Sequence, residues 1–130
     1  RIGGSAGTVR PVDVEHPFTG APGDGVQLAT GAVATSGLRA RIWRGPTGEV
    51  AHHLIDPSIG RPVFTGLVAV TAVAPRALRA EALAKAALLS GPAGAERVLT
   101  RHGGIVFDDA GVEHRYGVLA VPVRRRLRIA

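Results

Sequence analysis

A change of pattern close to residue 75 limits the folds open to this chain more than any other feature. Leu67–Ala74 is apolar and contains several β-branched residues, which is typical of a buried strand. Ala77–Leu89 follows, and Ala and Leu, both strong helix formers, occupy almost all of it. Because this helix carries charge only at Arg79, Glu81 and Lys85, we expect it to be mostly buried. A strand that leads directly into a buried helix predicts a sheet with a helical layer against it.

The rest of the chain adds strands before this pair, and a second helix and a hairpin after it. Alternating residues and Gly- and Pro-rich turns predict strands over residues 9–15, 26–35, 38–43, 50–55, 105–107 and 112–116. A second helix is predicted over residues 93–101, because Ser90, Gly91 and Pro92 break the first helix and Gly103 suits a C-cap. We therefore predict one domain over residues 1–130 with an α+β fold, an antiparallel sheet with two helices packed on one face.

Composition limits the class of protein. The chain has 130 residues, of which 45% are hydrophobic and 20% charged, enough for a packed core and unlike a disordered segment. Without Cys it has no disulfide framework and no thiolate metal site. The longest apolar stretch, residues 63–75, is shorter than the roughly 20 residues that span a membrane, so no membrane-spanning segment is expected. The sequence assigns no compartment, and a start at Arg1 rather than Met predicts further sequence upstream.

The positive charge of the chain has two interpretations. The net charge is +6, and 15 of the 16 basic residues are Arg, with a basic run at residues 124–128. Mutational bias in a GC-rich genome produces such a skew without selection on the surface. Attraction to phosphate-bearing ligands is the functional alternative. Aromatic residues make up only 4% of the chain, too few for a base-stacking platform, so we expect no nucleic-acid partner.

A histidine followed by an Asp-Pro turn is the most specific local feature. Residues 53–62 read H-L-I-D-P-S-I-G-R-P. Pro57 fixes its own φ, and Asp56 can accept backbone N–H groups within the turn, so the His53 ring could be held against a ligand. A strand-end His paired only with backbone is the simpler alternative. His52 is expected to point to the opposite face, so at most one of the two rings faces a ligand.

These residues resemble the H-I-I-D-P-x-T-G-x-P signature of the ApbE family. Residues 33–37 (V-A-T-S-G) resemble the strand end A-T-S-G of the same family, and residues 1–5 (R-I-G-G-S) resemble its N-x-G-G-D turn. The closing residues 104–113 resemble the family's last hairpin, and the central strand and Ala-rich helix follow in the family's order. Nearly the whole chain is covered, and the resemblance identifies it as a carboxy-terminal portion of such a protein.

The resemblance implies an activity and a set of site residues. ApbE proteins are FAD:protein FMN transferases, which move FMN from FAD to a Ser or Thr hydroxyl of an acceptor flavoprotein and release AMP. Catalytic roles are implied for His53 and Asp56. Contacts with FAD are implied for Ser36, Gly37, His53, Leu54 and Lys85. Read without the family, Ser36 and Gly37 form an ordinary strand-end turn with a hydroxyl and an N–H available.

The metal motif of the family is altered in this chain. ApbE proteins bind Mg²⁺ through an Asp and a Thr four residues apart on the Ala-rich helix, where this chain has Glu81 and Lys85. Glu81 keeps a carboxylate as the candidate metal ligand, but protonated Lys85 has no lone pair. Either the two form an ion pair along the helix, or the Lys85 ammonium meets the FAD pyrophosphate in place of the metal. Both alternatives predict weak or absent Mg²⁺ binding.

Other departures leave a second function open. Ser5 and Ile59 stand where the family has Asp and Thr. The amino-terminal half of the family's fold, which supplies many FAD contacts, is not part of this sequence, so the chain alone should not hold a complete site. The alternative function is a catalytically inactive homologue that binds FAD without transferring FMN.

Overall fold

The computed structural model describes residues 8–117; the predicted Gly-Gly turn at residues 1–5 and the basic run at 124–128 lie outside them. The strands are β1 (Arg10–Val12), β2 (Val26–Leu28), β3 (Ala32–Gly37), β4 (Ile42–Arg44), β5 (Val50–His52), β6 (Ile55–Asp56), β7 (Arg61–Pro62), β8 (Leu67–Ala74), β9 (Gly104–Asp108) and β10 (Glu113–Tyr116). The helices are the short 3₁₀ helix η1 (Arg39–Arg41), α1 (Ala77–Leu89) and α2 (Gly91–His102).

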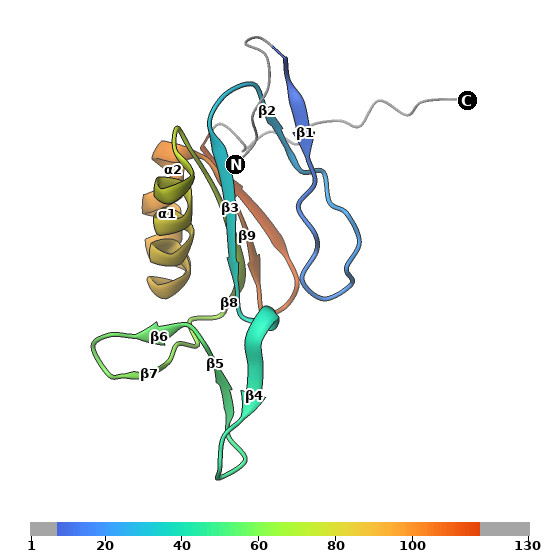
Figure 1. The fold of residues 1–130 in the computed structure, drawn as a ribbon. Coiled ribbons are helices and arrows are strands. Elements are labelled where there is room, and N and C mark those ends of the chain that lie inside the picture. The colour runs from blue at the N-terminus through green and yellow to red at the C-terminus, as the bar shows by residue number, and fades with distance from the viewer. Residues whose placement is uncertain (1–7, 118–130) are drawn as a thin grey trace.

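A four-stranded antiparallel sheet forms the centre of the fold, in the order β10–β9–β8–β3 (Figure 1). The predicted central strand Leu67–Ala74 is confirmed as β8, which pairs with β3 on one side and β9 on the other. Apolar side chains at most of its positions suit a strand that is covered on both faces. The ladder between β3 and β8 runs without a break from Ala32 and Ala74 to Gly37 and Ala69.

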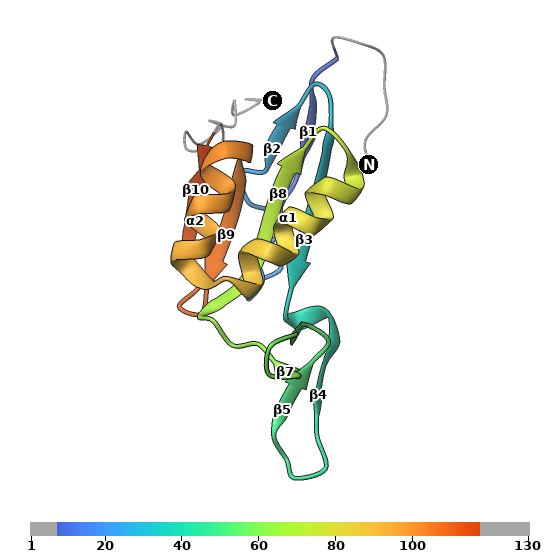
Figure 2. The same ribbon diagram turned by 90° about the vertical axis from the view of Figure 1, so that its left-hand side faces the viewer.

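Both helices cover the same face of this sheet, as predicted (Figure 2). α1 has the predicted bounds, and α2 begins two residues before the predicted start, with Pro92 in its first turn, where no N–H is needed. Ala80 and Ala84 are fully buried and let the helix lie close to the strands, while Leu88 and Leu99 fill the space between helices and sheet. This layer is the main hydrophobic core.

Gly103 ends α2 with a φ of 88°, which favours glycine, and its N–H donates to the carbonyl of Leu99 over 2.7 Å. The predicted C-cap is therefore confirmed. β9 starts at the next residue, so the chain turns directly from the helix layer into the sheet.

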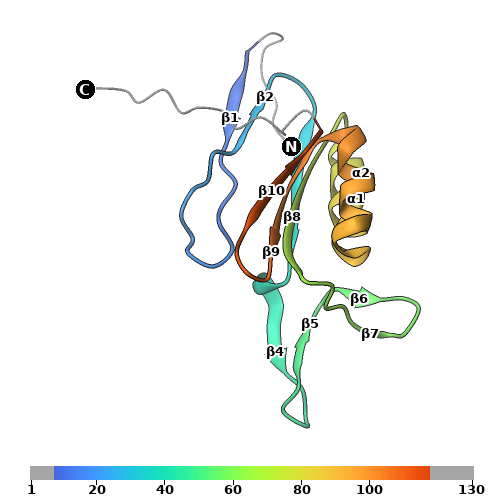
Figure 3. The same ribbon diagram turned by 180° about the vertical axis from the view of Figure 1, so that it is seen from behind.

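The opposite face of the sheet carries a second core that the sequence did not predict. The β1–β2 ladder and its long connection lie over β8 and β9, and Val14, Val26, Ala69, Ile105 and Phe107 pack together there. Figure 3 shows this ladder on the side away from the helices. The sheet is thus enclosed between a helical layer and an irregular layer.

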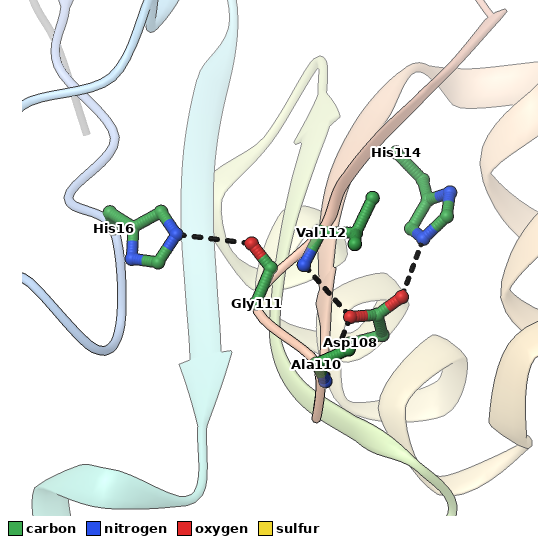
Figure 4. Close-up of polar contacts among 6 residues, drawn as sticks. All are labelled: His16, Asp108, Ala110, Gly111, Val112 and His114. Atoms are coloured by element: carbon green, nitrogen blue, oxygen red, sulfur yellow. Dashed lines mark hydrogen bonds and ion pairs between the residues drawn. The ribbon is translucent and has the colours of Figure 1, made fainter.

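A polar junction fixes the long β1–β2 connection against the β9–β10 turn (Figure 4). Nε2 of His16 donates to the carbonyl of Gly111 over 3.1 Å, while its Nδ1 accepts the N–H of Phe18. In the turn, the Asp108 carboxylate accepts two backbone N–H groups and pairs with Nε2 of His114 at 2.9 Å. The bond from His16 to Gly111 joins the two segments, and the other bonds fix the conformation of each.

Three strand predictions were wrong, those for residues 26–35, 38–43 and 50–55, the last because β5 ends at His52 and β6 begins at Ile55. Residues 26–35 are not one strand, because the chain turns at Gly31, where φ is 106° and an added Cβ would lie 2.8 Å from the carbonyl oxygen of Ala74. Residues 38–43 begin with η1 rather than a strand. Alternation of residue types does not distinguish an extended segment from a short 3₁₀ turn, which explains the second error.

Between β3 and β8 the chain leaves the sheet and forms two small hairpins, β4–β5 and β6–β7 (Figures 1 and 3). The β6–β7 hairpin projects on the side of the sheet that carries the helices (Figure 1). No helix among residues 8–117 is long and apolar enough to cross a membrane. One domain over residues 1–130 stays a prediction.

Candidate functional site

The residues predicted for the site gather around two places, the end of β3 with the hairpins that follow it, and the outer side of α1. Ser36 and Gly37 end β3 opposite Val70 and Ala69 of β8. The segment from His53 to Asp56 follows β5 directly. The chain's fold therefore brings residues 36–37 and 53–56 to the same end of the sheet (Figure 1).

Ser36 faces the helical layer. It shares the face of β3 with Ala32 and Ala34, which pack against Ala80 of α1, because alternate residues of a strand point the same way. Ser36 as a residue is only 8% exposed, so little of it is open to a ligand, and its contact with FAD stays a prediction. Its neighbour Gly37 is half-buried and offers only backbone.

The two adjacent histidines differ completely in burial, and which of them faces a ligand stays a prediction. His52 is fully buried, and its Nε2 donates to the carbonyl of Val63 over 2.8 Å. His53 is exposed to solvent. Leu54, the next residue, is buried in the main core, so only its backbone can reach a ligand.

Asp56 organises the turn between β6 and β7. Its Oδ1 accepts the N–H of Ser58 over 2.8 Å and the Ser58 hydroxyl over 2.6 Å. Both bonds lower the pKa of the Asp56 carboxyl, the hydroxyl first and the N–H second. The prediction that Asp56 accepts backbone N–H groups is confirmed, and this carboxylate is already engaged with its own turn.

Glu81 and Lys85 form an ion pair along the exposed side of α1, as one of the two alternatives predicted. The hydrogen bond from Lys85, followed by its charge, lowers the pKa of the Glu81 carboxyl. A carboxylate paired with an ammonium does not fit the octahedral oxygen shell of Mg²⁺. The described residues also contain no group of three or more His, Cys, Asp or Glu that could hold a metal.

A mostly apolar cavity of about 380 Å³ lies at the hairpin end of the sheet. Its apolar lining includes Phe18, Leu38, Ile42, Phe64 and Leu67, and its polar groups come from Arg39, His52 and Asp109. The volume is at the lower end of the range for ligand sites, which is roughly 300–1,000 Å³. It is large enough for one ring system rather than a whole dinucleotide.

Sequence reasoning missed the side chains of this cavity. The Arg39 guanidinium lies 5.8 Å from the centre of the Phe18 ring, although 21 positions separate them in sequence and Phe18 belongs to a loop predicted only as a connection. His52 could have been considered from the sequence, because it is adjacent to His53 and one of the two histidines was expected to face a ligand. Phe64, which is 62% exposed, follows the H-L-I-D-P segment closely and is an aromatic in a chain with few.

The structure does not join the two groups of predicted residues in one cavity. The β6–β7 hairpin and α1 lie on the same side of the sheet (Figures 1 and 3). None of the cavities lined by the described residues that we characterised takes in both His53 and Glu81. A cleft shared by these two side chains therefore stays a prediction.

Comparison with known proteins decides the family. A sequence model of the ApbE family matches residues 2–107, which is most of the chain. The chain belongs to the ApbE family. The resemblance found in residues 33–37 and 53–62 is thereby confirmed.

Curated relatives of this ApbE chain carry one printed function. The FAD:protein FMN transferase of Escherichia coli strain K12 is 34% identical over 98 residues, 75% of this chain and 26% of that protein. The FAD:protein FMN transferase of Salmonella typhimurium strain LT2 is 40% identical over 60 residues, 46% of this chain and 17% of that protein. The chain thus spans about a quarter of the length of the first of these relatives.

Solved structures of ApbE proteins have the same fold. The ApbE protein of Thermotoga maritima matches with a TM-score of 0.72 and 28% identity, over 83% of this chain and 36% of that one. The apo form of the Pseudomonas stutzeri flavinyl transferase ApbE matches with a TM-score of 0.66 and 26% identity, over 85% of this chain and 35% of that one. The predicted α+β fold with its antiparallel sheet and two helices is confirmed.

Proposed function

We propose that this chain forms one wall of the FAD site of an FAD:protein FMN transferase. The observation that carries the proposal is the placement of the H-L-I-D-P turn and the end of β3 at the same end of the sheet, beside an apolar cavity. The family match and the transferase relatives support it. The substrates of the reaction are FAD and an acceptor flavoprotein.

The proposed roles follow from the position and chemistry of each residue. We assign the isoalloxazine ring to the apolar cavity, whose aromatic lining and size suit a single planar ring system. We assign His53, exposed beside that end, to the polar part of FAD, where its imidazole can donate to a phosphate oxygen. Gly37 and Leu54 would contribute backbone contacts, and Ser36 a hydroxyl at the end of β3.

The reaction is a transfer of a phosphoryl group that bears riboflavin. The acceptor hydroxyl attacks the phosphorus of the FMN half of FAD, the bond to the bridging pyrophosphate oxygen breaks, and AMP leaves with that oxygen. The hydroxyl proton must be accepted, and His53 is the proposed catalytic base for this step. Because the Asp56 carboxylate is engaged with Ser58, we assign it to holding the turn that presents His53.

The cation that this chemistry requires is assigned to Lys85 rather than to Mg²⁺. Glu81 and Lys85 do not fit Mg²⁺, whereas the Lys85 ammonium can pair with a pyrophosphate oxygen as a point charge if it releases Glu81. Calorimetric titration with Mg²⁺ tests this assignment: the protein should bind weakly, and the double variant Glu81→Asp with Lys85→Thr should gain a site. Tight binding to the unaltered protein that is lost in Glu81→Ala would contradict it.

The transferase assay decides between the two candidate functions. The protein is incubated with FAD, Mg²⁺ and a Ser- or Thr-containing acceptor peptide, and mass spectrometry looks for a gain equal to FMN minus water. His53→Ala should reduce the product by about 100-fold, the usual size of a lost acid–base group, whereas Ile55→Ala, also exposed, should not. FAD binding without product, which the altered metal motif favours, would instead establish an inactive FAD-binding homologue.

A further inference from the structure

His52, the last residue of β5, bridges the residues just before and just after the β6–β7 hairpin. Its Nδ1 accepts the N–H of Leu54 over 3.2 Å, and its Nε2 donates to the carbonyl of Val63 over 2.8 Å. An imidazole can make both bonds only as the neutral tautomer with its proton on Nε2. Neither nitrogen is left to meet a substrate, although the ring is part of the cavity wall.

These bonds close the base of the family signature. The N–H of Val63 also donates to the carbonyl of Leu54 over 3.1 Å, so two backbone positions nine residues apart are joined both directly and through His52. Residues 55–62 beyond this base have no buried side chain, and β6–β7 is a ladder of only two residue pairs. A hairpin so small does not hold its own position, so its orientation depends on the base.

The same ring also positions one wall of the cavity. The rings of His52 and Phe64 meet edge to face with their centres 4.8 Å apart. Phe64 is 62% exposed, and both rings line the apolar cavity. A change at His52 therefore reaches the cavity through Phe64 and the exposed turn through Leu54.

We propose that His52 is a positioning residue, which orients the His53–Asp56 turn and the Phe64 ring toward the same ligand. The proposal rests on the proposed function, since the ligand is FAD. His52 touches neither the reacting atoms nor the polar part of the substrate. It acts by keeping the turn and the cavity wall in one fixed relation, so that an exposed imidazole and an apolar cavity can contact two parts of one molecule.

Three substitutions separate its two bonds. His52→Gln keeps a donor at the place of Nε2 and loses the acceptor, His52→Asn keeps an acceptor near Nδ1 and loses the donor, and His52→Phe keeps a ring but loses both bonds. Thr71→Val is the matched control, because Thr71 is equally buried and polar but lies in β8, away from the signature.

Two measurements are made on each variant of the full chain, FAD affinity from flavin fluorescence and amide hydrogen exchange by NMR. His52→Phe should weaken FAD binding by about tenfold, and raise exchange at Val63 by a similar factor, as the loss of one to two buried hydrogen bonds implies. Exchange at Val70 and Val106 in the sheet should stay unchanged. His52→Gln should recover part of both losses, and Thr71→Val should affect neither.

The outcomes are separable. Equal increases in exchange at Val63, Val70 and Val106 would mean that His52 serves only global stability, and would overturn the inference. Unchanged exchange at Val63 would do the same. If the unaltered protein binds no FAD, the proposed function fails, and the exchange pattern still decides separately whether His52 fixes the turn: increased exchange at Val63 alone supports that role, and unchanged exchange there overturns it. If His52→Phe does not fold, the same comparison of exchange at Val63, Val70 and Val106 is made for His52→Gln and His52→Asn, and it decides whether His52 positions the turn.

Discussion

The helical side of the sheet and its hairpin end are built in different ways. Against the helices, Val70, Leu88 and Leu99 are fully buried and each contacts neighbours on several elements. At the hairpin end, Ile42, Trp43 and Val50 are about half exposed on a two-stranded ladder. The first region is held by a continuous apolar core, the second by a few hydrogen bonds at its base. Rigidity and candidate chemistry are thus divided between two regions of the chain.

A substitution in the helical core should have the largest effect. Leu88→Ala removes a fully buried side chain between α1 and the sheet, and should lower the free energy of unfolding by about 2–5 kcal/mol. Urea unfolding followed by circular dichroism measures the change. Leu78→Ala, on the same helix but 80% exposed, is the control and should change it by less than about 0.5 kcal/mol. Equal effects would mean that α1 does not pack as described.

A hydrogen bond between two side chains of the sheet should matter less. The hydroxyls of Thr35 and Thr71 are 2.8 Å apart across β3 and β8, and Thr71 is buried while Thr35 is exposed. Thr71→Val keeps the shape and leaves the Thr35 hydroxyl to water, which should cost about 1 kcal/mol by chemical unfolding. Thr35→Val is the companion variant: it leaves the buried Thr71 hydroxyl without this partner, so its cost should be at least as large. A clearly smaller cost from Thr35→Val would contradict the contribution assigned to this bond.

The β9–β10 turn should make the thermal stability of the protein depend on pH. The bond to His114, then the N–H of Val112, lowers the pKa of the Asp108 carboxyl. A carboxyl with a depressed pKa in the folded state adds stability above its unfolded pKa and loses it as the pH falls through the folded value. The difference in melting temperature between the unaltered protein and Asp108→Asn should therefore be present at neutral pH and shrink in acid.

The effect at Asp108 should be small, because the Asp108 and His114 side chains are 24% and 44% exposed. Asp109→Asn changes the next carboxylate, for which no such pair exists in the described residues, and serves as the control. A difference between Asp108→Asn and the unaltered protein that grows in acid would reverse the assignment.

The smallest change is expected in the β4–β5 hairpin. Trp43→Ala removes the largest side chain of the β4–β5 hairpin, yet Trp43 is 50% exposed and should contribute less than about 0.5 kcal/mol to unfolding. Differential scanning calorimetry would detect a larger loss. A loss of more than about 1 kcal/mol in the free energy of unfolding would show that the hairpin end is packed as firmly as the helical side.

The same contrast explains how far the sequence alone could lead. The bounds of α1, the central strand and the closing hairpin were predictable because each has a strong local pattern that the core rewards. The break at Gly31 and the 3₁₀ helix η1 were not predictable, since both depend on contacts with β8. Gly31 lies against the carbonyl of Ala74, and the N–H of Leu38 donates to the carbonyl of Val68. The partners of Arg39 and His16 come from distant segments that no local pattern specifies.

For the candidate site, motif and contact information were complementary. The segment containing His53 and Asp56 could be found from sequence because its family signature is contiguous. The role of His52 could not, because both of its bonds are to backbone atoms, and backbone atoms are identical at every residue type. The same is true of the burial of Ser36, which results from the approach of α1.

β3 and β8 pair along six consecutive positions, although residues 38–66 lie between them in the chain. The pairing of β3 with β8 therefore does not depend on the conformation of residues 38–66. A change in the length of this segment alters the entropy of closing the loop only slowly. Only a few of its side chains, Leu38, Leu54 and Val63 among them, reach into the main core. Evolution can therefore change the residues of segment 38–66 that contact a ligand while the sheet and its two helices stay the same.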